Sequence, residues 1–159
     1  MQLHIQQATL SQKEVIAHLL QLYKYDFTEF DPEDVNEQGL YEYTYFHNYW
    51  TDDDRFPFLF TVDGMYAGFA LVRKLEHDTY SIAEFFVMKK YRQYGIGRQV
   101  AFQLFDSFSG TWEVAQMKEN IPAQLFWRNV IGTYTKGSYQ EITKEDWDGP
   151  IQRFQTSYR

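Results

Sequence analysis

The 159-residue sequence predicts a mixed α/β (α+β) fold in which about seven strands form a mostly antiparallel central sheet and about four helices flank it. Three observations lead to this prediction. Extended segments follow one another as a meander over 58–88, and helical and extended patterns then alternate to the C-terminus. No Pro/Gly/Ser-rich linker and no repeat divides the chain, so residues 1–159 are expected to form a single domain.

The N-terminal elements are a strand over 3–8 and an amphipathic helix that extends to about Tyr25. Ser11 and Glu14 match the S-x-x-E capping box, which predicts that the helix begins there. Its apolar face is predicted to consist of Val15, Ile16, Leu19, Leu20 and Tyr23.

Residues 26–54 have no clean period and an unusual composition. They contain ten Asp or Glu, no Lys or Arg, and eight aromatic residues. Only a short helical piece over 44–50 is expected within this segment.

The meander begins with strands over 58–62 and 65–72, separated by Asp63-Gly64, a strong signal for a two-residue hairpin turn. A third strand over 79–88 follows a turn near His77-Asp78. This third strand is almost continuously apolar, as in a strand covered on both faces, and Glu84 interrupts the run.

A helix of about three turns, ended by Gly110, and a strand over 112–117 come next. Asn120 and Pro122 open a further helix, since Pro is tolerated in the first helical turn. Strands over 138–143 and 150–156 complete the pattern and leave a sheet edge, so the sequence leaves open whether the chain forms a homodimer.

Composition excludes several classes of function. A net charge of −7 and a pI near 5.0 argue against nucleic-acid binding, which needs a basic face. The absence of cysteine excludes disulfides and thiol nucleophiles, and four scattered histidines without ligand spacing argue against a metal site. Without a long apolar segment or a leader-like N-terminus, the chain is expected to be soluble, cytoplasmic and not bound to a membrane.

The segment Arg92-x-x-Gly95-x-Gly97 lies between the third strand of the meander and the following helix. Unpaired backbone N–H groups and the positive end of a helix dipole bind phosphate at such a junction. Lys89, Lys90, Arg92 and Arg98 add four cations within ten residues. The alternative is an ordinary strand-to-helix turn whose charged side chains are solvated. The two common nucleotide-binding motifs, G-x-G-x-x-G and G-x-x-x-x-G-K-[ST], are both missing. A generic nucleotide-binding protein therefore has little support.

This junction resembles the [QR]-x-x-G-x-[GA] signature of the GNAT superfamily of acyl-CoA-dependent N-acyltransferases. Asn120-x-x-Ala123-x-x-Phe126-Trp127 is similar to the N-x-x-A-x-x-F-Y element of the same family. Within that family the chain most resembles a group of uncharacterised bacterial predicted acetyltransferases. The resemblance implies a GNAT fold and acetyl-CoA as co-substrate, with the pantetheine arm beside the strand and near Asn120. The implied cofactor-binding residues are Phe86, Val87, Met88, Arg92, Gln93, Tyr94, Gly95, Ile96, Gly97, Arg98, Asn120 and Trp127.

Glu84 is the candidate catalytic residue, because an amine with a pKa of about 10.4 must lose a proton before it attacks a thioester. Apolar surroundings would raise the pKa of Glu84, and we expect it to act as a base through water. The alternative is a carboxylate that pairs with a Lys or Arg on the neighbouring strand or is exposed at an edge. Trp127 stands where the family often has a tyrosine acid. Tyr134 or Tyr139 could substitute for that acid, but both are interpreted as packing or surface residues, so no general acid is assigned. Trp127 either walls the pantetheine or packs in the core.

The acidic, aromatic segment 26–54 occupies the place where GNAT folds wall the acceptor site. Carboxylates and aromatic faces both attract cations, which favours a small cationic amine of the polyamine or aminoglycoside type. An acidic solvated loop with packed aromatics is the alternative. The preferred prediction is therefore acetyl transfer from acetyl-CoA to a primary amine. The alternative is a catalytically silent module that binds or senses acyl-CoA. The sequence specifies neither the acceptor nor the length of the acyl group.

Overall fold

The computed structural model describes residues 1–157, which form one mixed sheet and three α-helices. The helices are α1 (Lys13–Phe27), α2 (Ile96–Ser107) and α3 (Ile121–Thr135). The strands are β1 (Leu3–Gln7), β2 (Arg55–Val62), β3 (Met65–Lys74), β4 (Thr79–Val87), β5 (Thr111–Ala115), β6 (Gln140–Lys144) and β7 (Trp147–Gln155).

The predicted fold class is confirmed: the sheet has seven strands in the order β1-β2-β3-β4-β5-β7-β6. β4 and β5 run parallel, whereas β1–β2, β5–β7 and β6–β7 are antiparallel pairs. The turn predicted at Asp63-Gly64 is present, and both residues have the positive φ that a type I′ hairpin requires. Residues 1–157 contain three α-helices rather than the expected four or so, because the piece expected over 44–50 is only a 3-10 turn at His47–Tyr49.

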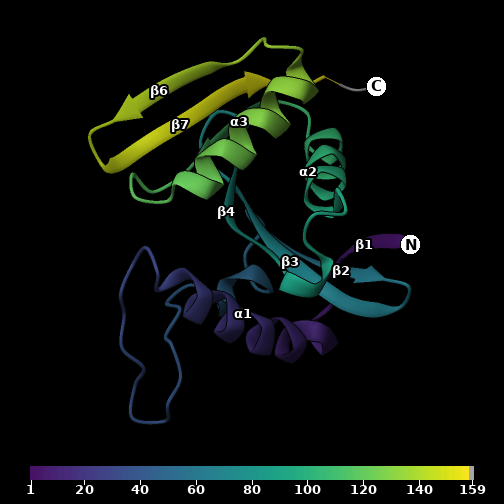
Figure 1. Ribbon diagram of the computed structural model, residues 1–159, viewed down its shortest axis with the longest axis vertical. Helices are drawn as coiled ribbons and strands as arrows, with labels where there is room; N and C mark the ends of the chain where they lie inside the picture. The colour runs from purple at the N-terminus through teal and green to yellow at the C-terminus, as the bar shows by residue number, and fades with distance from the viewer. Residues whose placement is uncertain (158–159) are drawn as a thin grey trace. The chain divides into compact units, whose positions relative to one another are not determined.

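The chain divides into two compact units. The N-terminal unit comprises residues 1–72 and 83–91, and the C-terminal unit comprises residues 73–82 and the chain from Arg92 onward. In the N-terminal unit, Ile16, Leu19 and Leu20 of α1 belong to one hydrophobic cluster with side chains of β2, β3 and β4. Figure 1 shows α1 and the long loop that follows it.

The expected start of α1 is wrong in detail. Ser11 lies within a 3-10 turn (Leu10–Gln12), and α1 starts at Lys13. The capping box is instead formed two residues earlier by Thr9 and Gln12, where the Thr9 backbone N–H donates to Gln12 Oε1 at 3.0 Å. Because Ser11 already has helical conformation, its side chain is not placed to cap; its hydroxyl lies 2.8 Å from the Thr9 hydroxyl.

Phe105 of α2 is the centre of the core of the C-terminal unit. Its ring centroid lies 4.9 Å from that of Phe154, 5.0 Å from Trp112 and 5.1 Å from Tyr134. These ring contacts pack α2, β5, α3 and β7 against one another. Figure 1 shows α3 beside the β6–β7 hairpin. Aromatic residues make up 19% of the sequence, and part of them thus serve as core packing. Of the helices within residues 1–157, none has the length and apolar character needed to cross a membrane.

Candidate active site

Glu84 lies on β4 in the N-terminal unit, partly buried beneath α1 and the loop that follows α1. Burial raises the pKa of its carboxyl group to about 7, while a hydrogen bond from Tyr23 and the charge of Lys24 both act to lower that pKa. Both of these partners lie on α1, not on the neighbouring strand. A carboxyl group with a pKa close to neutral is suited to exchange protons with an amine at physiological pH.

The ring of Tyr23 is held by three other aromatic rings. Its centroid lies 5.5 Å from that of Phe27, 5.7 Å from Phe69 and 5.7 Å from Phe86. The pKa of Tyr23 is raised, first by burial and then by the neighbouring Glu84 charge and the hydrogen bond to it. Sequence reasoning placed Tyr23 on the apolar face of the helix and missed this contact; the available signal was a hydroxyl on a face otherwise made of aliphatic side chains.

The loop between α1 and β2 is tied to α1. The side-chain amide of Gln21 donates to the Tyr41 carbonyl at 2.8 Å and accepts from the Tyr41 backbone N–H at 2.8 Å. Lys24 pairs with Glu33 at 2.7 Å, which anchors the loop at a second point. These contacts bring Tyr43 near Glu84, whose charge adds to burial in raising the pKa of Tyr43.

Several aromatic side chains of the acidic segment already face cations of the chain itself. Arg55 lies 5.0 Å from the ring centroid of Tyr45 and 5.4 Å from that of Tyr49. Lys24 lies 6.0 Å from the Tyr43 centroid, and Lys13 lies 5.8 Å from that of Trp50. Tyr43, Phe46, Tyr49 and Trp50 also pack in or against the hydrophobic cluster of the N-terminal unit. The exposed carboxylates, among them Glu29, Asp31, Asp34 and Glu37, are therefore the groups best placed to meet an external cation.

The residues after Glu84, on β4 and just beyond its end, have different environments. Phe86 is buried, with its ring 5.9 Å from that of Phe69, whereas Val87 and Met88 are partly exposed. The Met88 backbone N–H donates to the Ala67 carbonyl at 2.8 Å. Val87 and Met88 are thus the accessible members of the predicted pantetheine strand.

The segment from Arg92 to Arg98, in the C-terminal unit, forms the turn that leads into α2. Gly95 caps α2 with φ +75°, and Gln93 also has a positive φ of 69°. Gly95, at the N-cap position, has no side chain to cap the helix, and the first turn of α2 contains no acidic residue. Arg92, Gln93, Tyr94, Gly95 and Arg98 are exposed, Gly97 is partly exposed and Ile96 is buried. The first turn of a helix leaves its amides without a partner inside the helix, and most residues of this segment are exposed, so the turn is compatible with an anion site.

Asn120 and Trp127 also lie in the C-terminal unit, at the start and in the middle of α3. Asn120 Oδ1 accepts from the Ala123 backbone N–H at 3.1 Å, so this residue caps the helix. Trp127 is 6% exposed and packs near Phe105 and Phe126. The hydroxyl of Tyr134 donates to Asp106 Oδ1 at 2.6 Å, which engages it in linking α3 to α2.

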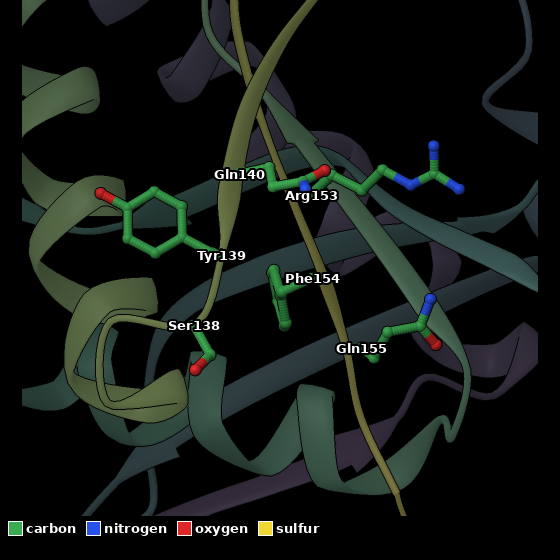
Figure 2. Close-up of a pocket in the computed structure, with 6 residues that line it drawn as sticks. All are labelled: Ser138, Tyr139, Gln140, Arg153, Phe154 and Gln155. Carbon is green, nitrogen blue, oxygen red and sulfur yellow. The ribbon is translucent and has the colours of Figure 1, made fainter.

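A separate pocket of about 650 Å³ lies on the β6–β7 side of the C-terminal unit (Figure 2). Its lining residues are Ser138, Tyr139, Gln140, Arg153, Phe154 and Gln155. None of the residues predicted to bind acetyl-CoA or to accept a proton lines it. β6 begins opposite Arg153 while β7 continues to Gln155, so the end of β7 has no β6 residue opposite it. We assign this pocket no part in the chemistry.

The central strand β4 leads through a Gly-containing turn into α2, as the resemblance to the GNAT superfamily implies. The family model for the acetyltransferase (GNAT) family matches residues 17–132. The chain belongs to this family, whose members in general transfer acetyl groups from acetyl-CoA. No curated protein shows significant sequence similarity to the chain.

Solved structures of GNAT proteins share the fold at low sequence identity. An acetyltransferase of the GNAT family from Staphylococcus aureus Mu50 has a TM-score of 0.69 and 15% identity, and covers 98% of this chain and 100% of its own. The ribosomal-protein-S18-alanine N-acetyltransferase from Escherichia coli has a TM-score of 0.65 and 16% identity, over 99% and 96%. PaiA N-acetyltransferase from Thermoplasma acidophilum, in complex with coenzyme A, has a TM-score of 0.64 and 10% identity, over 98% and 99%.

Proposed function

We propose that residues 1–159 form one N-acetyltransferase domain that transfers the acetyl group of acetyl-CoA directly to a primary amine in a ternary complex. The observation that supports this most strongly is the carboxyl group of Glu84, whose pKa lies near 7 in a chain that belongs to the GNAT family. At pH near 7.4 an amine with a pKa of about 10.4 is roughly 99.9% protonated, and removing that proton costs about 4 kcal/mol. A base with a pKa near 7 is suited to this task.

The acetyl-CoA site is proposed to follow the order of the chain from β4 into α2. Val87 and Met88, with the backbone at Phe86, flank the pantetheine arm, and the backbone amides of residues 93–98 hold the pyrophosphate. Arg92 and Arg98 add exposed positive charge. The fit rests on the acid-free first turn of α2, the positive φ of Gly95, and the open space around that glycine. Asn120 and Trp127 are retained as pantetheine contacts.

Bound acetyl-CoA supplies a thioester carbonyl that an amine can attack. Glu84 accepts the proton of that amine through a water molecule, and the amine then attacks as the neutral species. We assign no general acid: Trp127 has only an N–H, and the Tyr134 hydroxyl is engaged with Asp106. A thiol with a pKa of about 8.5 is a fair leaving group that water can protonate.

The alternative is a catalytically silent acyl-CoA-binding module, which the replacement of the family's tyrosine by Trp127 favours. Calorimetric titration with acetyl-CoA and 3′-dephospho-CoA, followed by thiol release with a panel of amines, separates the two functions. Binding with amine-dependent thiol release supports the enzyme. Binding without release from any amine supports the silent module, and absence of binding contradicts both.

We expect Gln99→Glu to weaken acetyl-CoA binding about tenfold, because a carboxylate one turn into α2 repels the pyrophosphate. The same charge benefits the helix dipole, so thermal stability is expected to be unchanged or slightly higher. Gln103→Glu, an exposed substitution one turn further along α2, is the matched control with the same net charge and is expected to bind nearly as the parent protein does. Equal weakening in both variants, measured by calorimetry at low salt, would indicate a net-charge effect and contradict the local site.

The acceptor is proposed to be a small cationic amine drawn by the exposed carboxylates of the acidic segment. Polyamines and aminoglycosides are expected to have a lower KM than neutral or acidic primary amines, and that KM is expected to rise with salt. A steady-state panel at 50 and 300 mM NaCl, about 14 and 6 Å in screening length, measures this. Acceptance of a neutral or acidic amine, with every cationic amine refused, would remove the hypothesis.

A further inference from the structure

The hydroxyl of Tyr23 is the polar end of a side chain that is otherwise enclosed by aromatic rings. The Tyr23 ring makes edge contacts with Phe69 at an interplanar angle of 83° and with Phe86 at 60°, and it lies beside Phe27 of its own helix. These rings come from β3, β4 and α1, so the direction of the hydroxyl is set by packing on three elements. Glu84 and Phe86 lie on the same face of β4, so the Tyr23 hydroxyl lies near the Glu84 carboxylate, on whose pKa it acts as a hydrogen-bond donor.

We propose that Tyr23 is a positioning residue that acts through Glu84: its hydroxyl orients the carboxylate and stabilises the deprotonated form that accepts the proton of the amine. This inference rests on the proposed function, because it gives Glu84 the part of the base. Tyr23 itself touches neither acetyl-CoA nor the amine in this scheme.

The groups that act on Glu84 differ in what they do to it. Burial disfavours the carboxylate, while the Tyr23 hydrogen bond and the positive charge of Lys24 favour it. Lys24 also pairs with Glu33 at 2.7 Å, which divides its charge between two carboxylates. From the loop, Tyr43 faces Glu84, and Tyr49 and Arg55 act on Tyr43. Tyr23 is therefore the partner that both orients the Glu84 carboxyl group and favours its deprotonated form.

The test is Tyr23→Phe, which keeps the ring and its packing and removes only the hydroxyl. The first measurement is the titration of the Glu84 carboxyl carbon by NMR in the protein without acetyl-CoA or amine, with the signal assigned by its loss in Glu84→Gln. The midpoint is expected to rise by about one pH unit, because a hydrogen bond to the charged form is lost. Tyr25→Phe, on the exposed side of the same helix, is the control and is expected to leave the midpoint where it is.

The second measurement is the pH profile of kcat/KM, which reports groups of the free enzyme. A midpoint that rises by about one unit makes Tyr23→Phe about fivefold less active at pH 7 and nearly equal to the parent at pH 9. The KM for acetyl-CoA is expected to stay the same. Tyr25→Phe is expected to match the parent throughout.

An unchanged Glu84 midpoint in Tyr23→Phe would overturn the inference, as would a loss of activity that is the same at every pH, which a merely structural role would produce. The proposed function fails by a different result. If Glu84→Gln retained full activity while the midpoint still moved in Tyr23→Phe, the hydrogen bond would stand and the base would have to be another group.

Discussion

Replacing Glu84 with Gln is expected to lower kcat by about 10²- to 10⁴-fold at pH 7, because the substitution removes the proposed proton acceptor and keeps the shape of the side chain. The parent enzyme is expected to gain activity as the pH rises through about 7, where the Glu84 carboxyl group becomes ionised. The variant loses this limb and retains only the rise at the pKa of the acceptor amine, about 10.4 for a lysine-like amine. Steady-state rates from pH 6 to 9.5 measure the difference.

The same substitution is expected to change stability in the opposite direction. The pKa of Glu84 is about 7 in the folded protein, above the ordinary value of 4.5, so the folded state binds the proton more tightly than the unfolded state does. The stability that this group contributes is complete below about pH 4.5 and is lost as the pH rises through about 7. Glu84→Gln is therefore expected to gain stability relative to the parent between pH 5 and pH 8, on the order of 2 kcal/mol, as measured by urea unfolding.

Glu76→Gln is the control for the loss of one negative charge, since Glu76 is exposed in the turn between β3 and β4. It is expected to leave both the rate and its pH dependence unchanged. Full activity of Glu84→Gln from pH 6 to 9 would contradict the assignment of the base. If Glu84→Gln lost activity but gained no stability relative to the parent at high pH, the conclusion that burial raises the pKa of Glu84 would be contradicted.

Elements whose signals are local were predictable from the sequence. The turn at Asp63-Gly64 needs two residues with positive φ, and Asp-Gly is a pair that adopts them. α2 and α3 followed from their apolar periodicity and from Pro122 in the first turn. The cap of α1 was less predictable, because two capping patterns, one from Thr9 and one from Ser11, overlap within a few residues and only the Thr9 pattern forms.

The environment of Glu84 shows where sequence reasoning ends. A lone carboxylate in an apolar strand pointed to an unusual pKa, and burial does raise it. Tyr23 and Tyr43 reach Glu84 from a helix and a loop that lie about 60 and 40 residues earlier in the chain, and no period or motif connects positions so far apart. The acidic segment was equally ambiguous, because its composition is the same whether its aromatic rings face an external amine or, as found for Tyr43 and Tyr49, cations of the chain itself.

Gly68→Ala is expected to destabilise the protein by about 3 kcal/mol, since overpacking of this kind forces the backbone to move. A β-carbon at Gly68 would lie 2.0 Å from the Phe86 carbonyl oxygen and 3.1 Å from Phe60 Cδ2. Gly68 does not have a positive φ, so the effect reports the contact and not a strained conformation. Thermal unfolding is expected to show a Tm lower by about 6–12 °C.

Gly132→Ala is the matched substitution with the opposite expected sign. A β-carbon there would lie 3.7 Å from Tyr139 Cε1, an ordinary van der Waals distance, and alanine is favoured over glycine within a helix by about 0.5–1 kcal/mol. Comparing Gly68→Ala with Gly132→Ala therefore separates two effects on stability: the close approach of β3 to β4, and the general effect of replacing a glycine. Because the Phe86 carbonyl belongs to the strand proposed to flank the pantetheine arm, Gly68→Ala should also weaken acetyl-CoA binding at temperatures where it remains folded. Equal stability of the two variants would mean that β3 and β4 do not approach as closely as the Phe86 contact requires.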